Sequence, residues 1–311
     1  MRLRLIAALA LAVTGALALV GGLSANGGPH GDYGPTTDAC AGCHRAHTAV
    51  GPKLLIASTT TALCQVCHGV TTNGANTDVW DGYLVGGPYG TTNGALNGGG
   101  FAYYKLQQGT STSATSTHDV SNSTAAAWGN GTSRGATASM SGGNLTCASC
   151  HDPHGSTNYR IIKTTINGYS VTVTDSTTKS YTDEYWAAGD QSIVCKACHD
   201  AYHKTAVGQG STADLGTFTH RVDMPYNASP YGSNPNPETT SLSGYYLPLA
   251  TSGSANNTVV CQTCHLPHGS SAQMSGYATT TSMTATGYSG PEDSALLRLN
   301  NRGVCEVCHR K

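Results

Sequence analysis

The sequence predicts a mostly irregular fold, with short α-helices and little β-structure. Three observations lead to this prediction. Only 11% of the 311 residues are charged, and the chain has 39 Gly, two Phe and long Ser/Thr/Asn tracts. Such a composition provides too little apolar side chain for an ordinary core at this length. All twelve cysteines fall in one repeated motif, so we expect something other than side-chain burial to organise the chain.

That motif is Cys-x-x-Cys-His, and it occurs six times. Its two thiols can add across the vinyl groups of one haem, and the histidine then lies under the iron as an axial ligand. The sequence therefore predicts a haem-cored multihaem c-type cytochrome with six covalent haems c, whose porphyrins replace the missing apolar side chains. The motif residues, in chain order, are Cys40, Cys43, His44, Cys64, Cys67, His68, Cys147, Cys150, His151, Cys195, Cys198, His199, Cys261, Cys264, His265, Cys305, Cys308 and His309.

Two other readings of the cysteines compete with haem attachment. Cys-x-x-Cys pairs can hold zinc, and an exported chain with twelve cysteines could be a disulfide scaffold. Neither reading explains a histidine directly after every pair, nor the identical spacing of all six pairs.

The first 25 residues carry the pattern of a secretory signal peptide. Two arginines precede an apolar run over residues 5–20, and small residues follow. We expect cleavage after residue 25 and a mature chain of residues 26–311, with an uncleaved anchor as the alternative. No second apolar run of spanning length follows, so no membrane span is expected after signal removal. Localisation is expected to be extracellular, at the cell surface, or periplasmic.

The net charge of −1 gives no electrostatic reason to expect nucleic acid as a partner. The expected partners are redox proteins or extracellular electron acceptors, and further copies of the chain if it forms a homopolymer.

The spacing of the motifs predicts three modules. From the second cysteine of one motif to the first of the next, the intervals are 20, 79, 44, 62 and 40 residues, alternately short and long. The motifs therefore group in pairs, and we expect haem-pair modules at approximately 26–75, 76–215 and 216–311.

The first motif of each pair has a second histidine three residues after the motif histidine. These residues are His47, His154 and His268. A histidine in a loop is often merely solvated, but the same offset recurs three times. We therefore expect these side chains to be distal ligands of neighbouring haems.

A count of histidines indicates that every iron can have two histidine ligands. Six of the thirteen histidines lie in motifs, and seven remain for six distal positions. Either His30 or His203 is expected to be the spare one, and the methionines are less favoured ligands. The seven are His30, His47, His118, His154, His203, His220 and His268.

Regular structure is expected only locally. Short helices are predicted over residues 37–46 and 192–202, because one motif fits about one helical turn. Residues 161–182 alternate β-branched and polar side chains around Asn167-Gly168, which predicts a hairpin. Residues 107–144 form a polar excursion that His118 is expected to fix as a ligand.

Several features together resemble a known family. They are the paired motifs, the string CASCHDPHG over residues 147–155, the CHxxxH of His199 and His203, and a sixth motif close to residue 311. They resemble the outer-surface hexahaem cytochromes that polymerise into nanowires. The resemblance implies an extracellular filament with one continuous chain of haems in alternating parallel and T-shaped contact. It also implies that a histidine of one subunit ligates a haem of the next, and His47 is the matching residue.

The sequence thus predicts electron transfer and no enzymatic activity. One alternative is a periplasmic multihaem reductase of nitrite, hydroxylamine or a sulfur oxyanion, which needs one iron with an open position. Another is a structural or adhesive surface protein, which the Ser/Thr/Gly-rich composition would fit. A high-spin haem signal would indicate the reductase, and haems isolated from any redox partner would indicate the structural protein.

Overall fold

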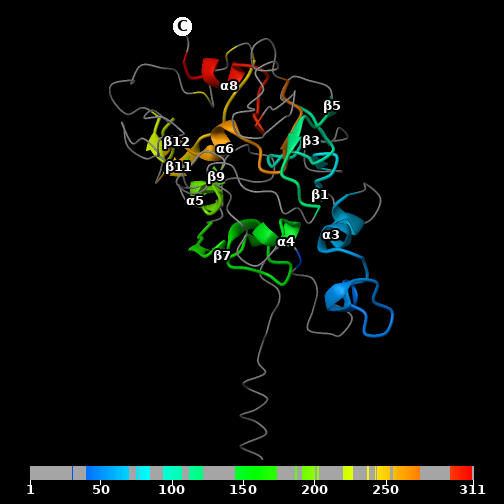
Figure 1. Cartoon of the computed structure of the whole chain (residues 1–311). Helices are drawn as coiled ribbons and strands as arrows, with labels where there is room; N and C mark the ends of the chain where they lie inside the picture. The colour runs from blue at the N-terminus through cyan, green and yellow to red at the C-terminus, as the bar shows by residue number, and fades with distance from the viewer. Residues whose placement is uncertain are drawn as a thin grey trace, which may run out of the picture.

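In the computed structural model, the described residues form a series of short helices and strand fragments (Figure 1). The predicted signal segment and His203 lie outside the residues it describes. Those residues are 30, 40–69, 75, 77–84, 94–106, 112–121, 144–173, 186–187, 191–199, 202, 220–226, 237, 242, 244–252, 255–273 and 295–309.

Each α-helix of the described residues carries cysteines of one motif. Most are a single turn, as expected where two cysteines three residues apart must face the same side. In Figure 1, α3 lies beside α4, and α8 lies at the opposite end of the molecule. The helices are α3 (Thr60–His68), α4 (Cys147–Cys150), α5 (Gln191–Lys196), α6 (Cys261–Cys264) and α8 (Gly303–Glu306).

Hydroxyl side chains fix the first turn of three of these helices. The Thr59 hydroxyl accepts a hydrogen bond from the Ala62 N–H at 3.0 Å and caps α3. In α4 and α6, the capping side chain lies inside the helix, on the residue just before the second cysteine. It accepts a hydrogen bond from the N–H of the residue that precedes the helix. Ser149 accepts from the N–H of residue 146 at 2.9 Å, and Thr263 accepts from that of residue 260 at 3.0 Å.

The predicted helices at residues 37–46 and 192–202 are shorter in the structure. Only Cys40 and Ala41 are helical in the described part of the first, and α5 ends at Lys196 in the second. In the first, the chain leaves the helix because His44 pairs with Leu55 in an antiparallel bridge. Residues 37–39 and 200–201 lie outside the described residues.

The predicted hairpin is confirmed over residues 165–170. Thr165 pairs with Ser170 and Ile166 with Tyr169. Asn167 and Gly168 form the turn, with φ of 48° and 83°. Positive φ at both central residues is the signature of the turn that suits a two-residue hairpin, and Asn-Gly is its preferred sequence. Residues 174–182 of the prediction lie outside the described residues.

Other strands appear that the sequence did not indicate, most of them two residues long. They form a four-stranded sheet in the order β10-β12-β11-β9, a three-stranded sheet β1-β2-β3, and the pairs β13-β6 and β4-β5, while β7-β8 is the predicted hairpin. The strands are β1 (Thr77–Asp78), β2 (Tyr83–Leu84), β3 (Gly94–Ala95), β4 (Tyr103–Tyr104), β5 (Thr112–Ser113), β6 (Ser116–Thr117), β7 (Thr165–Ile166), β8 (Tyr169–Ser170), β9 (Trp186–Ala187), β10 (Met224–Pro225), β11 (Ala250–Ser252), β12 (Ala255–Val259) and β13 (Gly269–Ser270).

The apolar core of the described residues consists of four small clusters rather than one. One gathers Leu266 with Tyr104 and Leu106, and another gathers Leu247 and Leu299 with the α8 region. A third lies beside the β7–β8 hairpin, and a fourth includes Leu249. Short helices, strand fragments and scattered clusters, in a described part of the chain that is otherwise mostly coil, confirm the predicted fold class.

No helix in the described part of the chain has the length and apolar character needed to cross a membrane.

Candidate functional site

All twelve cysteines are free of disulfides, and those of the second, third and fifth motifs lie on α3, α4 and α6. The disulfide alternative therefore finds no support in the structure. Within the described residues, no group of three or more His, Cys, Asp or Glu side chains is placed to hold a metal ion.

Within each predicted pair of motifs, the second cysteines are neighbours. Burial, and then the charge of the neighbouring thiol, raises the pKa of one cysteine in each pair. This holds for Cys43 next to Cys67, for Cys150 next to Cys198 with a pKa of about 11, and for Cys264 next to Cys308 with a pKa of about 12.

Between successive pairs, the first cysteines are neighbours instead. The hydrogen bond between the side chains of Cys64 and Cys147 raises the pKa of Cys64 and lowers that of Cys147 to about 7. In the same way, the hydrogen bond between the side chains of Cys195 and Cys261 raises the pKa of Cys195 and lowers that of Cys261. The packing of the helices is consistent with these thiol contacts, because α3 packs on α4 and α5 packs on α6 (Figure 1). The six motifs thus form one series of neighbours in sequence order, which the sequence alone did not reveal.

Four motif histidines turn the same ring nitrogen toward the backbone. A carbonyl oxygen can only accept a hydrogen bond, so Nδ1 carries the proton and Nε2 is left with its lone pair. Such a bond also fixes the ring's orientation and makes it a stronger ligand. The Nδ1 to oxygen distances are 2.9 Å for His44 to Lys53, 3.1 Å for His68 to Thr77, 2.9 Å for His151 to Arg160 and 2.7 Å for His265 to Ala295.

Burial keeps several of these rings neutral. It lowers the pKa of His68, His151 and His265, and also that of His118, which lies outside the motifs. Burial, followed by the nearby His151 ring, lowers the pKa of His268 to about 3. A neutral imidazole is the form that binds a metal, so the environment prepares these side chains as ligands.

Five motif histidines each face a second histidine from elsewhere in the chain. The separations of the ring centroids fall in a narrow range, although the five partners come from different parts of the chain. The pairs are His44–His154 at 6.2 Å, His68–His30 at 6.0 Å, His151–His268 at 6.3 Å, His199–His118 at 6.1 Å and His309–His220 at 6.3 Å.

This separation fits one metal ion between two imidazoles. Two metal–nitrogen bonds of about 2.0 Å, with each ring centroid about 1.1 Å behind its nitrogen, would set the centroids about 6.2 Å apart. The donor set of two thiols and two facing histidines therefore fits a covalently attached, six-coordinate haem c at each of these five places.

The five pairs leave three histidines, namely His47, His203 and His265. His203 lies outside the described residues. His265 has no facing ring in the described part of the chain, and His47 is exposed. His30 was one of the two residues expected to be the spare histidine. In the structure it lies against His68.

His268 occupies a tightly fitted place. Its ring stacks on Phe101, with centroids 5.1 Å apart and an interplanar angle of 30°. On another side lies Gly98, where an added Cβ would stand 2.8 Å from Nδ1 of His268. The glycine is therefore needed for close approach, a role that the sequence alone did not indicate.

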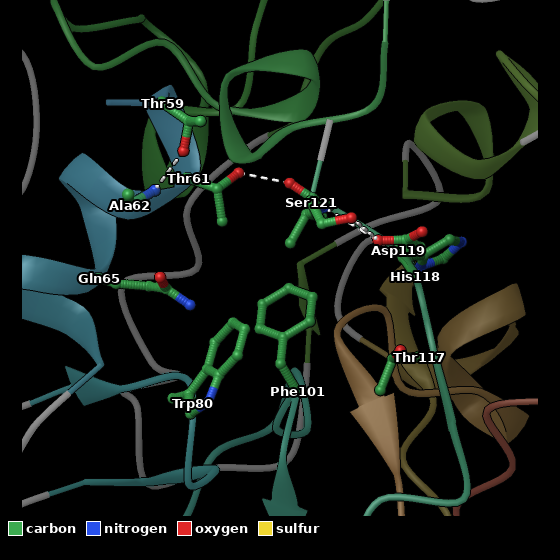
Figure 2. Close-up of a pocket in the computed structure, with 11 residues that line it drawn as sticks. Thr59, Thr61, Ala62, Gln65, Trp80, Phe101, Thr117, His118, Asp119 and Ser121 are labelled. Atoms are coloured by element: carbon green, nitrogen blue, oxygen red, sulfur yellow. Dashed lines mark hydrogen bonds between the residues drawn. The ribbon is translucent and has the colours of Figure 1, made fainter. Parts of the chain in front are cut away.

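A hollow of about 220 Å³ lies between α3 and the segment that carries His118 (Figure 2). Thr61 of α3 closes one end by donating a hydrogen bond to the carbonyl of Val120. The Cys147 thiol lies 3.9 Å from the same hydroxyl. Thr61 thus ties the second motif, the third motif and the predicted ligand His118 together. That His118 fixes the excursion of residues 107–144 as a ligand stays a prediction, because residues 107–111 and 122–143 lie outside the described part of the chain.

Comparisons with known proteins agree with the motif content. The family described as "Doubled CXXCH motif" matches residues 34–73 and 139–168. No curated protein matches the chain. Among solved structures, the chain is similar to the "Outer Membrane Cytochrome S Filament from Geobacter Sulfurreducens", with 17% identity and a TM-score of 0.43 over 88% of this chain and 98% of that one. At this level of similarity, nothing about assembly or partners carries over from that filament.

The first matched segment contains the first two motifs, grouped as the spacing predicted, and the second contains the third motif. The match confirms the doubled CxxCH motifs, and the chain has the haem-attachment motifs of a multihaem c-type cytochrome that binds covalent haem c.

Proposed function

We propose that this chain is an exported electron conduit that holds six haems c, each between two histidines. Bound haem c supplies reversible one-electron chemistry at its iron. The chain's own residues fix each cofactor through two thioethers and two imidazoles, and leave no coordination position for a substrate.

One observation carries this proposal. Five motif histidines each face a second histidine at a centroid separation between 6.0 and 6.3 Å. A reductase needs an open iron, so five closed sites support electron transfer over catalysis.

The order of the motifs supports conduction along the chain. Neighbouring thiols link the motifs from first to sixth without a gap. The contacts alternate between second cysteines within a pair and first cysteines between pairs. Two alternating kinds of contact agree with the alternating haem arrangement that the family resemblance implies.

The remaining site supports assembly with a second copy. His154, from the second pair of motifs, faces His44 of the first pair, and His268, from the third pair, faces His151 of the second. If this rule continues, His265 of the third pair needs the corresponding histidine of a following pair. His47 of another copy is that residue, and it is exposed. A head-to-tail contact of this kind produces a filament when the rotation between successive copies does not close into a ring.

His265 also carries the second candidate function. If no histidine of any copy reaches this site, its iron has an open position, as a multihaem reductase requires. The reductase would then act at the fifth motif and at none of the five paired sites.

The test is to determine the haem count and the spin state of the purified holoprotein, together with electron microscopy. A mass corresponding to six haems, a wholly low-spin spectrum and filaments would support the conduit and its assembly. Wholly low-spin monomers would support a diffusible carrier in which a histidine of the same chain, such as His203, serves the fifth site. A high-spin fraction of about one sixth that shifts on addition of nitrite or hydroxylamine would favour the reductase.

A further inference from the structure

Three short turns share a strained backbone conformation. Each consists of two consecutive residues with positive φ, a region that side-chain-bearing L-residues rarely adopt. These six are two thirds of the nine such non-glycine residues in the described part of the chain, so the strain is concentrated. The turns, which we call clasps, are Lys53–Leu54 (φ 59° and 61°), Arg160–Ile161 (54° and 51°) and Ala295–Leu296 (48° and 59°).

Every clasp contacts the histidine of the first motif of a pair. The carbonyl of the first clasp residue is the acceptor for Nδ1 of that histidine, at 2.9 Å for Lys53, 2.9 Å for Arg160 and 2.7 Å for Ala295. The same relationship thus recurs in all three predicted modules.

Further backbone bonds hold each clasp in place. The carbonyl of the second clasp residue accepts from the residue after the histidine, and a residue just beyond the clasp donates to the second cysteine's carbonyl. The distances are 2.8 Å (Arg45 to Leu54), 2.7 Å (Asp152 to Ile161) and 2.8 Å (Leu266 to Leu296) for the first bond, and 3.0 Å (Ile56 to Cys43), 2.9 Å (Lys163 to Cys150) and 2.9 Å (Arg298 to Cys264) for the second.

The second motif of the first pair is built differently. Nδ1 of His68 lies 3.1 Å from the Thr77 carbonyl and 3.0 Å from its hydroxyl. Thr77 lies in β1 and has no positive φ. A histidine can therefore obtain a carbonyl partner in this protein without a strained turn, so the clasps need another explanation.

Strained conformations persist where surrounding structure determines them, and they concentrate at functional sites. Glycine would adopt these turns without strain, but it would also leave the carbonyl free to move. The chain instead has Ile161, a β-branched residue, in one of the turns. Side chains at these positions restrict the backbone to a narrow region and so hold the acceptor carbonyl still.

We propose that the three clasps are positioning devices that fix the proximal imidazole of the first haem in each pair and strengthen it as a ligand. A fixed carbonyl acceptor sets the tautomer, the plane of the ring and its basicity. A more basic imidazole stabilises the oxidised iron and lowers its potential. The proposal rests on the assignment of His44, His151 and His265 as axial ligands.

The test uses Lys53, whose side chain is exposed, so that substitutions change backbone preference without removing packing. Lys53→Val introduces a β-branched residue that disfavours positive φ, whereas Lys53→Asn tolerates it. Both remove the same positive charge. For each six-haem holoprotein, we would record the low-spin electron paramagnetic resonance signals and a stepwise reductive titration.

We expect the Val variant, relative to the Asn variant, to shift one of the six low-spin signals and to move one of the six potentials upward. Identical signals and potentials in the two variants would overturn the proposal. If the Val variant does not retain six haems, Lys53→Gly with Leu54→Gly replaces it. The double variant is expected to broaden one low-spin signal, and an unbroadened set would equally overturn the proposal.

These outcomes are separable from the fate of the proposed function. A wild-type protein with high-spin iron, or one that does not conduct, would contradict the bis-histidine conduit. The Val and Asn comparison would still report on the proximal ligand of the first haem, because thioether attachment at Cys40 and Cys43 does not depend on the distal ligand.

Discussion

Gly98 and His268 approach each other so closely that no side chain fits between them. A Cβ at residue 98 would lie 2.8 Å from Nδ1 and 2.9 Å from Cε1 of the imidazole. The ring cannot retreat freely, because Phe101 stacks on it. The position of this proposed distal ligand therefore depends on the absence of one methyl group.

Gly98→Ala is expected to displace His268 from His151 and to turn one iron high-spin, while all six haems stay attached. Haem count by mass and the spin state by optical spectroscopy measure this. Gly168→Ala is the matched control, because nothing lies within 4 Å of its Cβ and the cost is confined to positive φ in the hairpin, roughly 1 kcal/mol. A high-spin signal in the control as well would remove the link to His268.

His154→Ala is expected to leave six haems attached and to turn one iron high-spin, because the His154 ring faces His44 at 6.2 Å. His154→Met should restore a low-spin state, since methionine is also an axial ligand, and should raise one potential. A fully low-spin alanine variant would contradict the pairing of His154 with His44.

His47→Ala tests the contact between copies. We expect loss of filaments in electron micrographs and one high-spin iron, because the site at His265 would lose its donor. His154→Ala serves as the control for a ligand within the copy, since it should produce high-spin iron without removing the residue at the proposed junction. Filaments of unchanged length in the His47 variant would argue against this junction.

Cys150→Ala is expected to lower the mass by about one haem and to destabilise the middle part of the chain. The variant removes an apolar porphyrin surface together with its cross-link, and metal binding of this kind contributes directly to folding. Mass spectrometry gives the haem count and thermal unfolding gives the stability. An unchanged unfolding temperature would show that haem is not the core of this region.

The sequence predicted the chemistry of the site better than its arrangement. Motif residues define attachment locally, so spacing within each motif was sufficient. The sequence singled out His154 and His268 as ligands for other haems, and this stays a prediction. In the structure each of them faces a motif histidine, His44 and His151 respectively, and the sequence did not identify these partners. Such pairing depends on contacts between distant loops, and one sequence carries no signal of them.

The fold was predictable only where local rules decide it. Asn167-Gly168 favours one turn, and that hairpin is present. The helix predicted to reach residue 46 stops at Ala41 in the described part, because the bridge between His44 and Leu55 overrides helix propensity. The clasp residues were missed for a related reason: nothing in Lys-Leu, Arg-Ile or Ala-Leu indicates positive φ.

If the histidine pairs are the axial ligands proposed above, they also set an order of events during export, when the chain emerges from its N-terminal end. Each second motif finds its partner already present, because His30, His118 and His220 precede His68, His199 and His309 in the chain. For the first motifs the facing histidine emerges later, because His154 follows His44 and His268 follows His151 in the chain. Under the proposed ligation, biogenesis passes through stages in which each newly loaded first site stays incomplete until the following pair arrives.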